Sequence, residues 1–280
     1  MRWLLALLLC VGLPAGAQPL VRLDHIPTAV RDLDQAVADF KALGFAIKPG
    51  RPHANGLRNA HIKFANGAGL ELITATEARD ELSGHYVGFL REGEGPAYLT
   101  LHADDEARAA AALKAAGVAH RFDANGLALM DPRLDWIFFA GDNRSPTDKP
   151  EHFAHANSAV ATKEVWVATD DATPLAELLS ALGAKAHDET RRQPFPAQAR
   201  VFDLADGGRV VIVPARHRLV PNHPLIAVVM ATRAGAMRWH QTHGLWLGLE
   251  SVNATAMGRE GPPQGANQGA ARSPHSRAGQ

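Results

Sequence analysis

The chain has almost no cysteine, since Cys10 is the only one among 280 residues. That cysteine lies in an N-terminal segment of the kind that is removed on export, so the mature chain can form no disulfide and has no thiol chemistry. An exported protein without disulfides must be stabilised by its core alone. Excess charge is also absent: 29 Lys and Arg balance 29 Asp and Glu. Nothing therefore indicates nucleic acid or an anionic membrane as a partner.

The N-terminal segment has the three parts of a signal peptide. Arg2 provides the positive charge, residues 3–13 form an apolar run, and Ala15-Gly16-Ala17 matches a cleavage site. The apolar run is too short to span a bilayer, which takes roughly 20 residues. We therefore predict a signal peptide over residues 1–17 and an exported mature protein, periplasmic or secreted, that starts at Gln18 and has no membrane contact after cleavage.

Motifs for common cofactors are missing as well. The sequence contains no Walker loop, no dinucleotide-binding fingerprint and no HExxH pattern. We therefore expect no organic cofactor. The length permits one large domain or two of about 100–150 residues.

What the chain does contain is a repeated order of elements. In the first copy, Asp32 is a helix N-cap with Gln35 as its partner, an apolar stripe of period 3.6 follows, and Gly44 ends the helix. Strands precede and follow this helix, and the last two are joined by the turn at Asn66-Gly67. The order is βαβββ, with strands expected at residues 21–26, 45–48, 59–64 and 70–74.

The same order returns along the chain. A second copy starts at residue 97, and a third starts at residue 163 after a polar break. A fourth copy begins with a strand at 225–231 and an expected helix at 235–243, and then dissolves into Gly, Pro, Ala, Arg, Ser and Gln. A truncated module and a shifted reading frame would both produce this pattern. The predicted organisation is a domain of two modules at 18–140, a linker at 141–158, a second region with an incomplete fourth module at 159–250, and a disordered tail at 251–280.

Modules of this kind must pair, because a single open four-stranded sheet leaves a face and an edge exposed. We predict an α+β fold in which βαβββ modules pair into a cupped, mostly antiparallel sheet with helices outside and a pocket in the centre. The unpaired sheet face of an incomplete fourth module would favour a homodimer.

Several short stretches point to one family. His25 lies on the first strand, Asp32-Leu33-Asp34 starts the helix, Leu43-Gly44-Phe45 ends it, and Glu71 lies in a Glu-Leu-Ile strand. This combination resembles the glyoxalase-like domains of the vicinal oxygen chelate superfamily, most closely over residues 20–75. The motif His-Ala-Asn at 155–157 also resembles that group.

The resemblance implies a divalent metal (Zn, Fe, Mn or Ni) in the cup, bound by residues on the first and fourth strands of each paired module. His25 and Glu71 occupy the two positions of the first module. A carboxylate between Leu70 and Leu72 is costly unless it is paired, bound to a metal or exposed. A structural histidine within the sheet and a solvated outer-face glutamate are the alternatives to these two roles.

The second half of such a metal site is missing from the sequence. Matching Gly117 to Gly44 puts Tyr98 opposite His25 and a residue near Ile137 opposite Glu71. Neither is a good ligand. The same matching of Gly183 in the third copy places Glu164 and Val210 at these positions.

Other side chains are candidates for completing or lining the site. Asn59, His61, His102, His155 and Asn157 are candidate pocket residues. Of these, His102 on a strand end and His155 in a loop are also candidate third ligands. Simple exposure explains His102 equally well, and a polar linker explains the residues at 155–157.

Two functions remain open at this point. In the first, a metal at His25 and Glu71 binds two neighbouring oxygens of a small molecule and stabilises an enolate, while Glu71 carries the proton, as in a lyase or isomerase. In the second, the protein binds or sequesters a small molecule in the same cup without catalysis.

Overall fold

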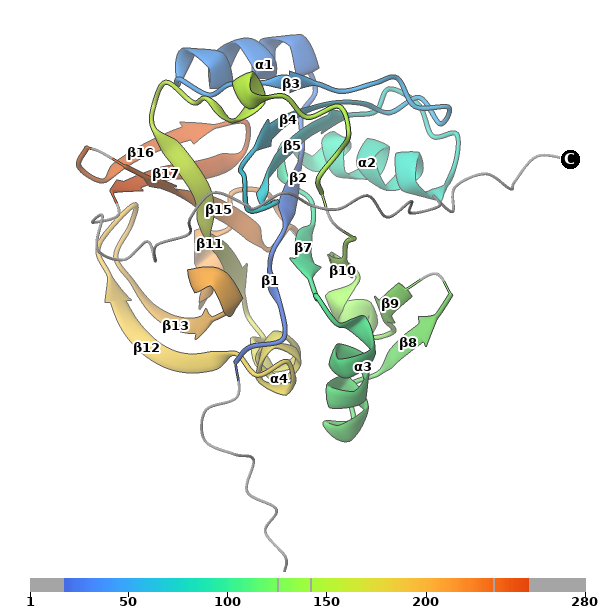
Figure 1. Ribbon diagram of the computed structural model, residues 1–280. Helices are drawn as coiled ribbons and strands as arrows, with labels where there is room; N and C mark the ends of the chain where they lie inside the picture. Colours follow the sequence, from blue (N-terminus) through green and yellow to red (C-terminus); the bar gives the residue numbers. More distant parts are fainter. Residues whose placement is uncertain (1–17, 125, 142, 234, 252–280) are drawn as a thin grey trace, which may run out of the picture.

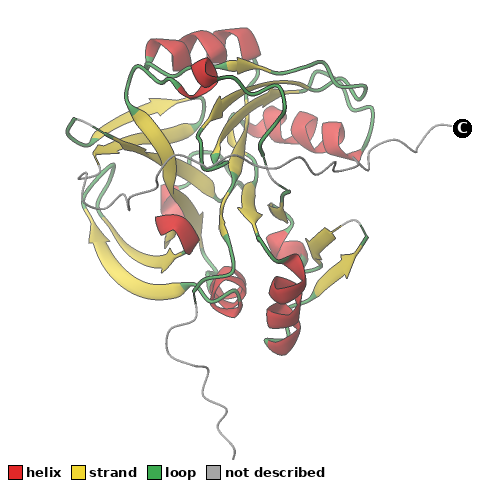
Figure 2. Cartoon of the chain, viewed as in Figure 1, coloured by secondary structure: helices red, strands yellow, loops and turns green. Residues whose placement is uncertain are grey.

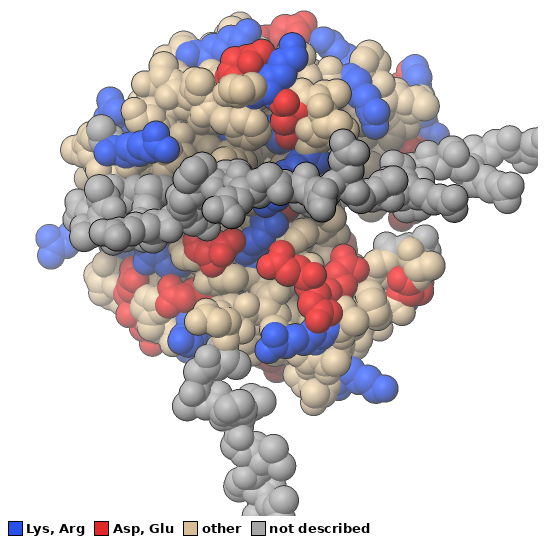
Figure 3. Space-filling view, viewed as in Figure 1, with Lys and Arg blue, Asp and Glu red and all other residues tan. Residues whose placement is uncertain are grey.

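The computed structural model describes residues 18–124, 126–141, 143–233 and 235–251. The predicted signal peptide and residues 252–280 of the predicted tail lie outside these ranges. Four α-helices and mixed sheets make up the described part (Figures 1 and 2), so the predicted α+β class is confirmed. None of the described helices is long and apolar enough to cross a membrane. Acidic and basic side chains both occur across the face seen in Figure 3.

The first module has the predicted element order. Asp32 caps α1 by accepting a hydrogen bond from the backbone N–H of Gln35, and Gly44 follows the helix with φ of 87°. Phe40 is the fully buried anchor of the helix on the sheet. The elements are β1 (Arg22–Leu23), β2 (His25–Ala29), α1 (Leu33–Ala42), β3 (Lys48–Pro49), β4 (Arg58–Lys63) and β5 (Gly69–Thr74).

Helix α2 (Glu81–Glu92) was not predicted from the sequence. A capping box of Asp80 and Ser83 starts it. Its buried face, with Tyr86 and Phe89, belongs to the same apolar cluster as Ala29 of β2 and Ile73 of β5. Helix α2 therefore covers the end of the sheet at which β2 and β5 finish.

The second module continues the same sheet. Strands β1 and β2 run antiparallel to β6 (Gly95–Pro96) and β7 (Leu99–His102), with Arg22 opposite His102 and Thr28 opposite Pro96. This long pairing joins the sheet orders β3-β4-β5-β2-β6 and β1-β7-β10. The remaining elements are α3 (Glu106–Ala115), β8 (His120–Asp123), β9 (Gly126–Leu129), a 3₁₀ turn (Pro132–Leu134) and β10 (Ile137–Phe139).

The second half of the chain forms one seven-stranded sheet in the order β12-β13-β14-β11-β15-β17-β16. Its core strands, β11 and β15, pair antiparallel as the first strands of the third and fourth copies. The elements are β11 (Ala159–Thr169), α4 (Thr173–Ala181), β12 (Lys185–Arg191), β13 (Ala197–Asp203), β14 (Arg209–Pro214), β15 (Leu225–Thr232), β16 (Arg238–Thr242) and β17 (Leu245–Ser251), with 3₁₀ turns at Pro150–Phe153, Ala205–Gly207 and Ala215–His217.

The prediction of a helix at 235–243 is wrong, because most of that segment forms strand β16. His243 and Gly244 both have positive φ, 43° and 67°, and connect β16 to β17 as a two-residue hairpin turn. The pairing with β17 stabilises the strand, which propensity alone did not indicate. Strand β12 was also missed, because its polar sequence belongs to an exposed sheet edge that carries no apolar alternation.

Candidate functional site

His25 and Glu71 lie on neighbouring parallel strands, as the sequence predicted. In the β2–β5 register Pro27 is opposite Glu71 and His25 is opposite Gly69. The Nε2 atom of His25 is 3.5 Å from Oε2 of Glu71, and the two side chains are 17% and 14% exposed. The pair is therefore largely buried yet reachable from solvent.

Asp24 holds the imidazole of His25 in place. Its Oδ1 lies 2.5 Å from Nδ1 of His25 and accepts the backbone N–H of His25 at 2.7 Å. The Asp24 side chain is fully buried, and its Oδ2 has no hydrogen-bond partner among the described residues. With Nδ1 engaged, Nε2 faces Glu71. Sequence reasoning missed Asp24, and its only signal was its position beside His25.

These contacts fix the charge of His25. Burial disfavours the imidazolium, but the hydrogen bonds and negative charges of Asp24 and Glu71 outweigh burial and raise the pKa of His25 to about 9. Burial alone would raise the pKa of Glu71, yet the contact with His25, together with the charge of His61 and a hydrogen bond from Asn59, lowers it to about 2. At neutral pH the pair is an imidazolium facing a carboxylate.

Asn59 and His61 of β4 complete the group. Asn59 donates from Nδ2 to Oε1 of Glu71 at 2.5 Å, and His61 is opposite Glu71 in the β4–β5 register. Mainly burial lowers the pKa of His61, whose Nδ1 has no hydrogen-bond partner in the described structure. We call Asp24, His25, Asn59, His61 and Glu71 the first-cup cluster.

The structure does not bring His102 into this cluster. Its Nδ1 lies 3.0 Å from the carbonyl oxygen of Ala140 and its Nε2 lies 3.1 Å from Asp104, beyond the end of β7. Both ring nitrogens therefore already have partners at the far end of the strand. The structure therefore does not support the predicted role of His102 as a third ligand beside His25.

His155 and Asn157 also lie away from the cluster, and both tie the segment before β11 to the first module. His155 accepts the backbone N–H of Ala46 at Nδ1, so its Nε2 carries the hydrogen and donates to the carbonyl of Lys63 at 2.9 Å. Asn157 donates to the carbonyl of Leu43. These side chains hold two segments together, and their predicted place in the pocket is not supported.

Aromatic residues occupy the matching positions of the second module. When Gly117 is matched to Gly44, Thr100 corresponds to Pro27. The residue opposite Pro27 on the neighbouring parallel strand is Glu71, and the residue opposite Thr100 is Phe138. The residue that corresponds to Glu71 is thus Phe138, which fits the expected residue near Ile137. The ring of Phe138 lies 6.3 Å from that of His25 and 5.5 Å from that of Tyr98.

In the third copy, Glu164 takes the position of His25. Its carboxylate is 1% exposed and lies 3.2 Å from Arg191 and 2.8 Å from Arg209, and it accepts the indole N–H of Trp166. The position of Glu71 is filled by Val211, the parallel partner of Trp166, and not by the predicted Val210. This second cup is therefore closed by an ion-pair network and apolar side chains.

The donor set of the first cup does not fit a resident metal ion. Two donor atoms 3.5 Å apart could contact one ion, but a stable catalytic zinc site uses three protein ligands. Across the described ranges, no three His, Cys, Asp or Glu side chains are arranged to hold a metal ion. Tyr98 and Phe138 stand where the resemblance places the other ligands.

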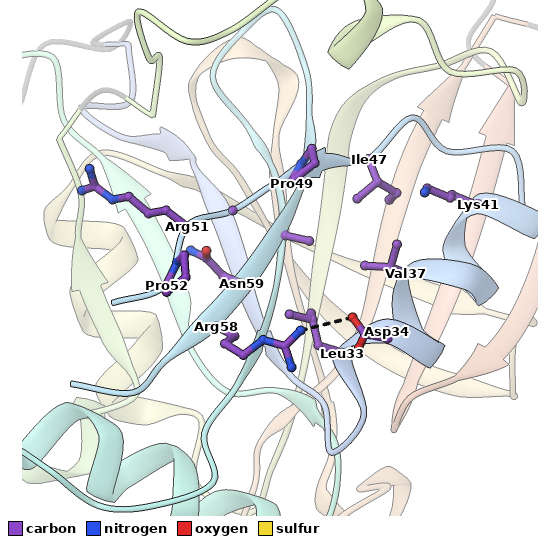
Figure 4. A pocket seen from close by; sticks show the side chains of 12 residues that line it. Leu33, Asp34, Val37, Lys41, Ile47, Pro49, Arg51, Pro52, Arg58 and Asn59 are labelled. Carbon is purple, nitrogen blue, oxygen red and sulfur yellow. Dashed lines mark hydrogen bonds and ion pairs between the residues drawn. The ribbon is translucent and has the colours of Figure 1, made fainter. Parts of the chain in front are cut away.

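A groove lies on the helix-covered side of the first sheet. It has a volume of about 310 Å³ and lies between α1 and β3–β4, with Asn59 in its wall (Figure 4). Lys41, Arg51 and Arg58 stand around it, and Arg58 forms an ion pair with Asp34 at 3.2 Å.

The model of the glyoxalase-like domain family matches residues 23–183, which is more than half of the chain. The chain belongs to the glyoxalase-like domain family. Its first and second modules and the start of the third lie within that match. No curated protein matches this glyoxalase-like chain.

Solved structures show the same vicinal oxygen chelate fold. A hypothetical protein from Staphylococcus aureus has a TM-score of 0.61 at 15% identity and covers 83% of this chain and 99% of its own. A mutant 4-hydroxymandelate synthase from Streptomyces coelicolor has a TM-score of 0.60 at 11% identity and covers 84% of this chain and 93% of its own. A catechol 2,3-dioxygenase has a TM-score of 0.55 at 13% identity and covers 89% of this chain and 91% of its own. At these identities the likeness concerns the fold alone.

Proposed function

We propose that this glyoxalase-like protein binds a small molecule with neighbouring oxygens in its first cup. The observation that carries the proposal is the imidazolium of His25, which is fixed by Asp24 and faces Glu71 at 3.5 Å. A charge-assisted hydrogen bond between such groups is usually 2.7–2.9 Å long. The longer separation leaves the Nε2–H of His25 available to a ligand oxygen.

The other groups of the cup suit the rest of such a ligand. The edge of the Phe138 ring, backed by Tyr98, gives an aromatic wall beside His25. The buried Nδ1 of His61 and Oδ1 of Asn59 have no protein partner in the described part of the chain. Buried polar atoms are rarely left unpaired, so a water or a ligand group is expected beside them.

Proton transfer is the second candidate function, because the two pKa values are pushed apart within one pair. Glu71 would take a proton from a carbon next to a carbonyl whose oxygen accepts the Nε2–H of His25. The C–H bond breaks, an O–H bond forms on Glu71, and the electron pair moves to the enolate oxygen. On a substrate that carries a hydroxyl on that carbon, Glu71 returns the proton to the former carbonyl carbon, the hydroxyl proton passes to the former carbonyl oxygen, and the carbon that lost its hydrogen becomes the new carbonyl, which completes an isomerisation.

This chemistry requires the ligand to separate the pair. With its pKa near 2, Glu71 is a weak base in the free protein. An oxygen inserted at His25 would engage the imidazolium and weaken its hold on the carboxylate, which would raise the pKa of Glu71. A metal-dependent lyase or isomerase would need ligands that Tyr98 and Phe138 do not supply.

Histidine-selective NMR tests the proposal. Benzoylformate, which carries neighbouring oxygens, and phenylacetate, which lacks the keto oxygen, would be titrated separately. We expect saturable shifts of the His25 ring with benzoylformate and weaker binding of phenylacetate. His25→Gln should abolish the effect, and the matched variant His152→Gln, in a half-buried 3₁₀ turn outside the cluster, should not. Equal binding of both compounds, or binding that survives His25→Gln, would refute the proposed site.

Catalysis separates the two candidates, and a further ligand is needed to test it. If Glu71 transfers a proton, a ligand with an acidic C–H next to its carbonyl should exchange that hydrogen for deuterium in D₂O. Glu71→Gln should stop the exchange while leaving binding measurable. Binding without exchange supports the non-catalytic role.

We also propose that the protein is exported through residues 1–17. The support is the three-part pattern of that segment in the sequence. Mass spectrometry of the mature protein from a secreting bacterial host should find Gln18 at its N-terminus. An intact N-terminus on protein in the cytoplasmic fraction would count against export.

A further inference from the structure

A second cavity lies apart from the first-cup cluster, between α2 and the loop that precedes β15. Its volume is about 370 Å³. Four aromatic rings line it, those of Tyr86, Phe89, Tyr98 and Trp136. The ring of Tyr98 packs against Tyr86 at 5.7 Å and against Phe138 at 5.5 Å, so Tyr98 stands between the cavity and the wall of the first cup.

Two glycines of α2 leave this cavity open. Gly84 and Gly88 are four residues apart, on one face of the helix, and both line the cavity. A Cβ added at Gly88 would meet no atom within 4 Å, and one added at Gly84 would meet only Ala78 at an ordinary 3.7 Å. Neither has a positive φ. Glycine in a helix costs up to about 1 kcal/mol relative to alanine. Neither steric crowding nor backbone conformation requires glycine at these two positions. A ligand lying flat on the helix would require it, because a larger side chain would occupy the same space.

The charge around the cavity is negative. Asp135 lines it, and burial together with the charges of Asp135 and Glu81 raises the pKa of Tyr98. His223 also lines it, with its ring centroid 3.7 Å from that of Phe89 at an interplanar angle of 34° and with Glu92 at 3.4 Å from its Nε2. Among the described lining residues, none is Lys or Arg. Aromatic faces beside carboxylates attract cations.

We propose that this cavity is a second binding site, which takes a planar organic cation such as an aromatic amine. The flat ring lies on the open surface at Gly84 and Gly88 between the aromatic side chains, and the cationic group faces Asp135. The proposal does not rest on the ligand proposed for His25 and Glu71, although Tyr98 borders both sites.

Fluorescence titration with proflavine, a planar cation, tests this site on the full chain. We expect saturable binding that weakens at least tenfold in Gly88→Leu, because the new side chain fills the open helix surface. Asp135→Asn should weaken binding several-fold. Ala111→Leu, which adds a leucine to the exposed face of α3, should bind as the wild type does.

Two further results keep the test decisive. Gly88→Leu should melt at the same or a higher temperature than the wild type, because leucine favours the helix, so its lost binding would not reflect unfolding. Binding should persist in His25→Gln, whatever the outcome of the proposal for the first cup. Absence of saturable binding, unchanged affinity in Gly88→Leu, or equally tight binding of the anionic dye anilinonaphthalene sulfonate would overturn the proposal.

Discussion

Replacing Glu71 by Gln should make His25 lose its proton at a lower pH. The substitution keeps the shape of the side chain and an acceptor for Asn59 but removes the charge 3.5 Å from Nε2 of His25. At that distance two unit charges attract by about 1 kcal/mol in water and about 5 kcal/mol at an effective dielectric of 20. Since about 1.4 kcal/mol corresponds to one pH unit, the pKa of His25 should fall by at least about one unit.

Stability should follow the same charge. The pKa of His25 is raised from 6.5 to about 9 in the folded protein, so the stabilisation is complete below about pH 6.5 and is lost as pH rises through 9. The rise corresponds to roughly 3 kcal/mol. Urea unfolding at pH 6.5 and at pH 9 should show this loss in the wild type and a smaller loss in Glu71→Gln.

The assay is NMR titration of labelled histidine rings, with His25 assigned through His25→Gln. Glu92→Gln, which removes a carboxylate beside His223, is the matched control and should leave His25 unchanged. A His25 that titrates near pH 6.5 in the wild type, or that titrates alike in Glu71→Gln, would refute the argument from geometry to charge.

Two further substitutions test contacts that hold the modules. His243 lies 3.0 Å from both Asp39 of α1 and Glu94, and His243→Ala should lower the free energy of unfolding by roughly 1–3 kcal/mol; a urea midpoint equal to the wild type would contradict this. Arg209→Ala leaves the buried carboxylate of Glu164 with one cation fewer and should cost about 3–5 kcal/mol, with Arg209→Lys losing less, as measured by thermal and urea unfolding. A loss below about 1 kcal/mol would show that Arg191 alone neutralises Glu164.

The sequence predicted those elements whose signals are local. The cap at Asp32 and the glycine at 44 set the bounds of α1 in both sequence and structure. The pairing of His25 with Glu71 followed from the resemblance to the family. Their separation is fixed by the β2–β5 register, which no local pattern gives.

What the sequence could not give depends on long-range pairing. The difference between the predicted Val210 and the observed Val211 at the position of Glu71 is a single step in strand register, and that step decides which side chain faces the cup. Strand β16 looked helical because its stabilising partner, β17, lies beyond a turn. Asp24 carries no periodic signal, and only its 2.5 Å contact with His25 shows its role.

The same limits explain α2. Its N-cap at Asp80 and the spacing of Tyr86, Phe89 and Leu90 are readable signals of a helix. They fall between the first and second modules, where the repeat of βαβββ gives no place for an additional helix. The structure places it against Ala29 and Ile73, and its other residues line the second cavity.

The central claim is that the first cup holds a protonated His25 between two carboxylates and not a resident metal ion. Elemental analysis of protein purified without chelator, with His25→Ala and Glu71→Ala beside it, tests this most directly. The account predicts far less than one equivalent of Zn, Fe, Mn or Ni, and no thermal shift when these ions are added at low micromolar concentration. One equivalent of metal in the wild type that both variants lose would contradict it.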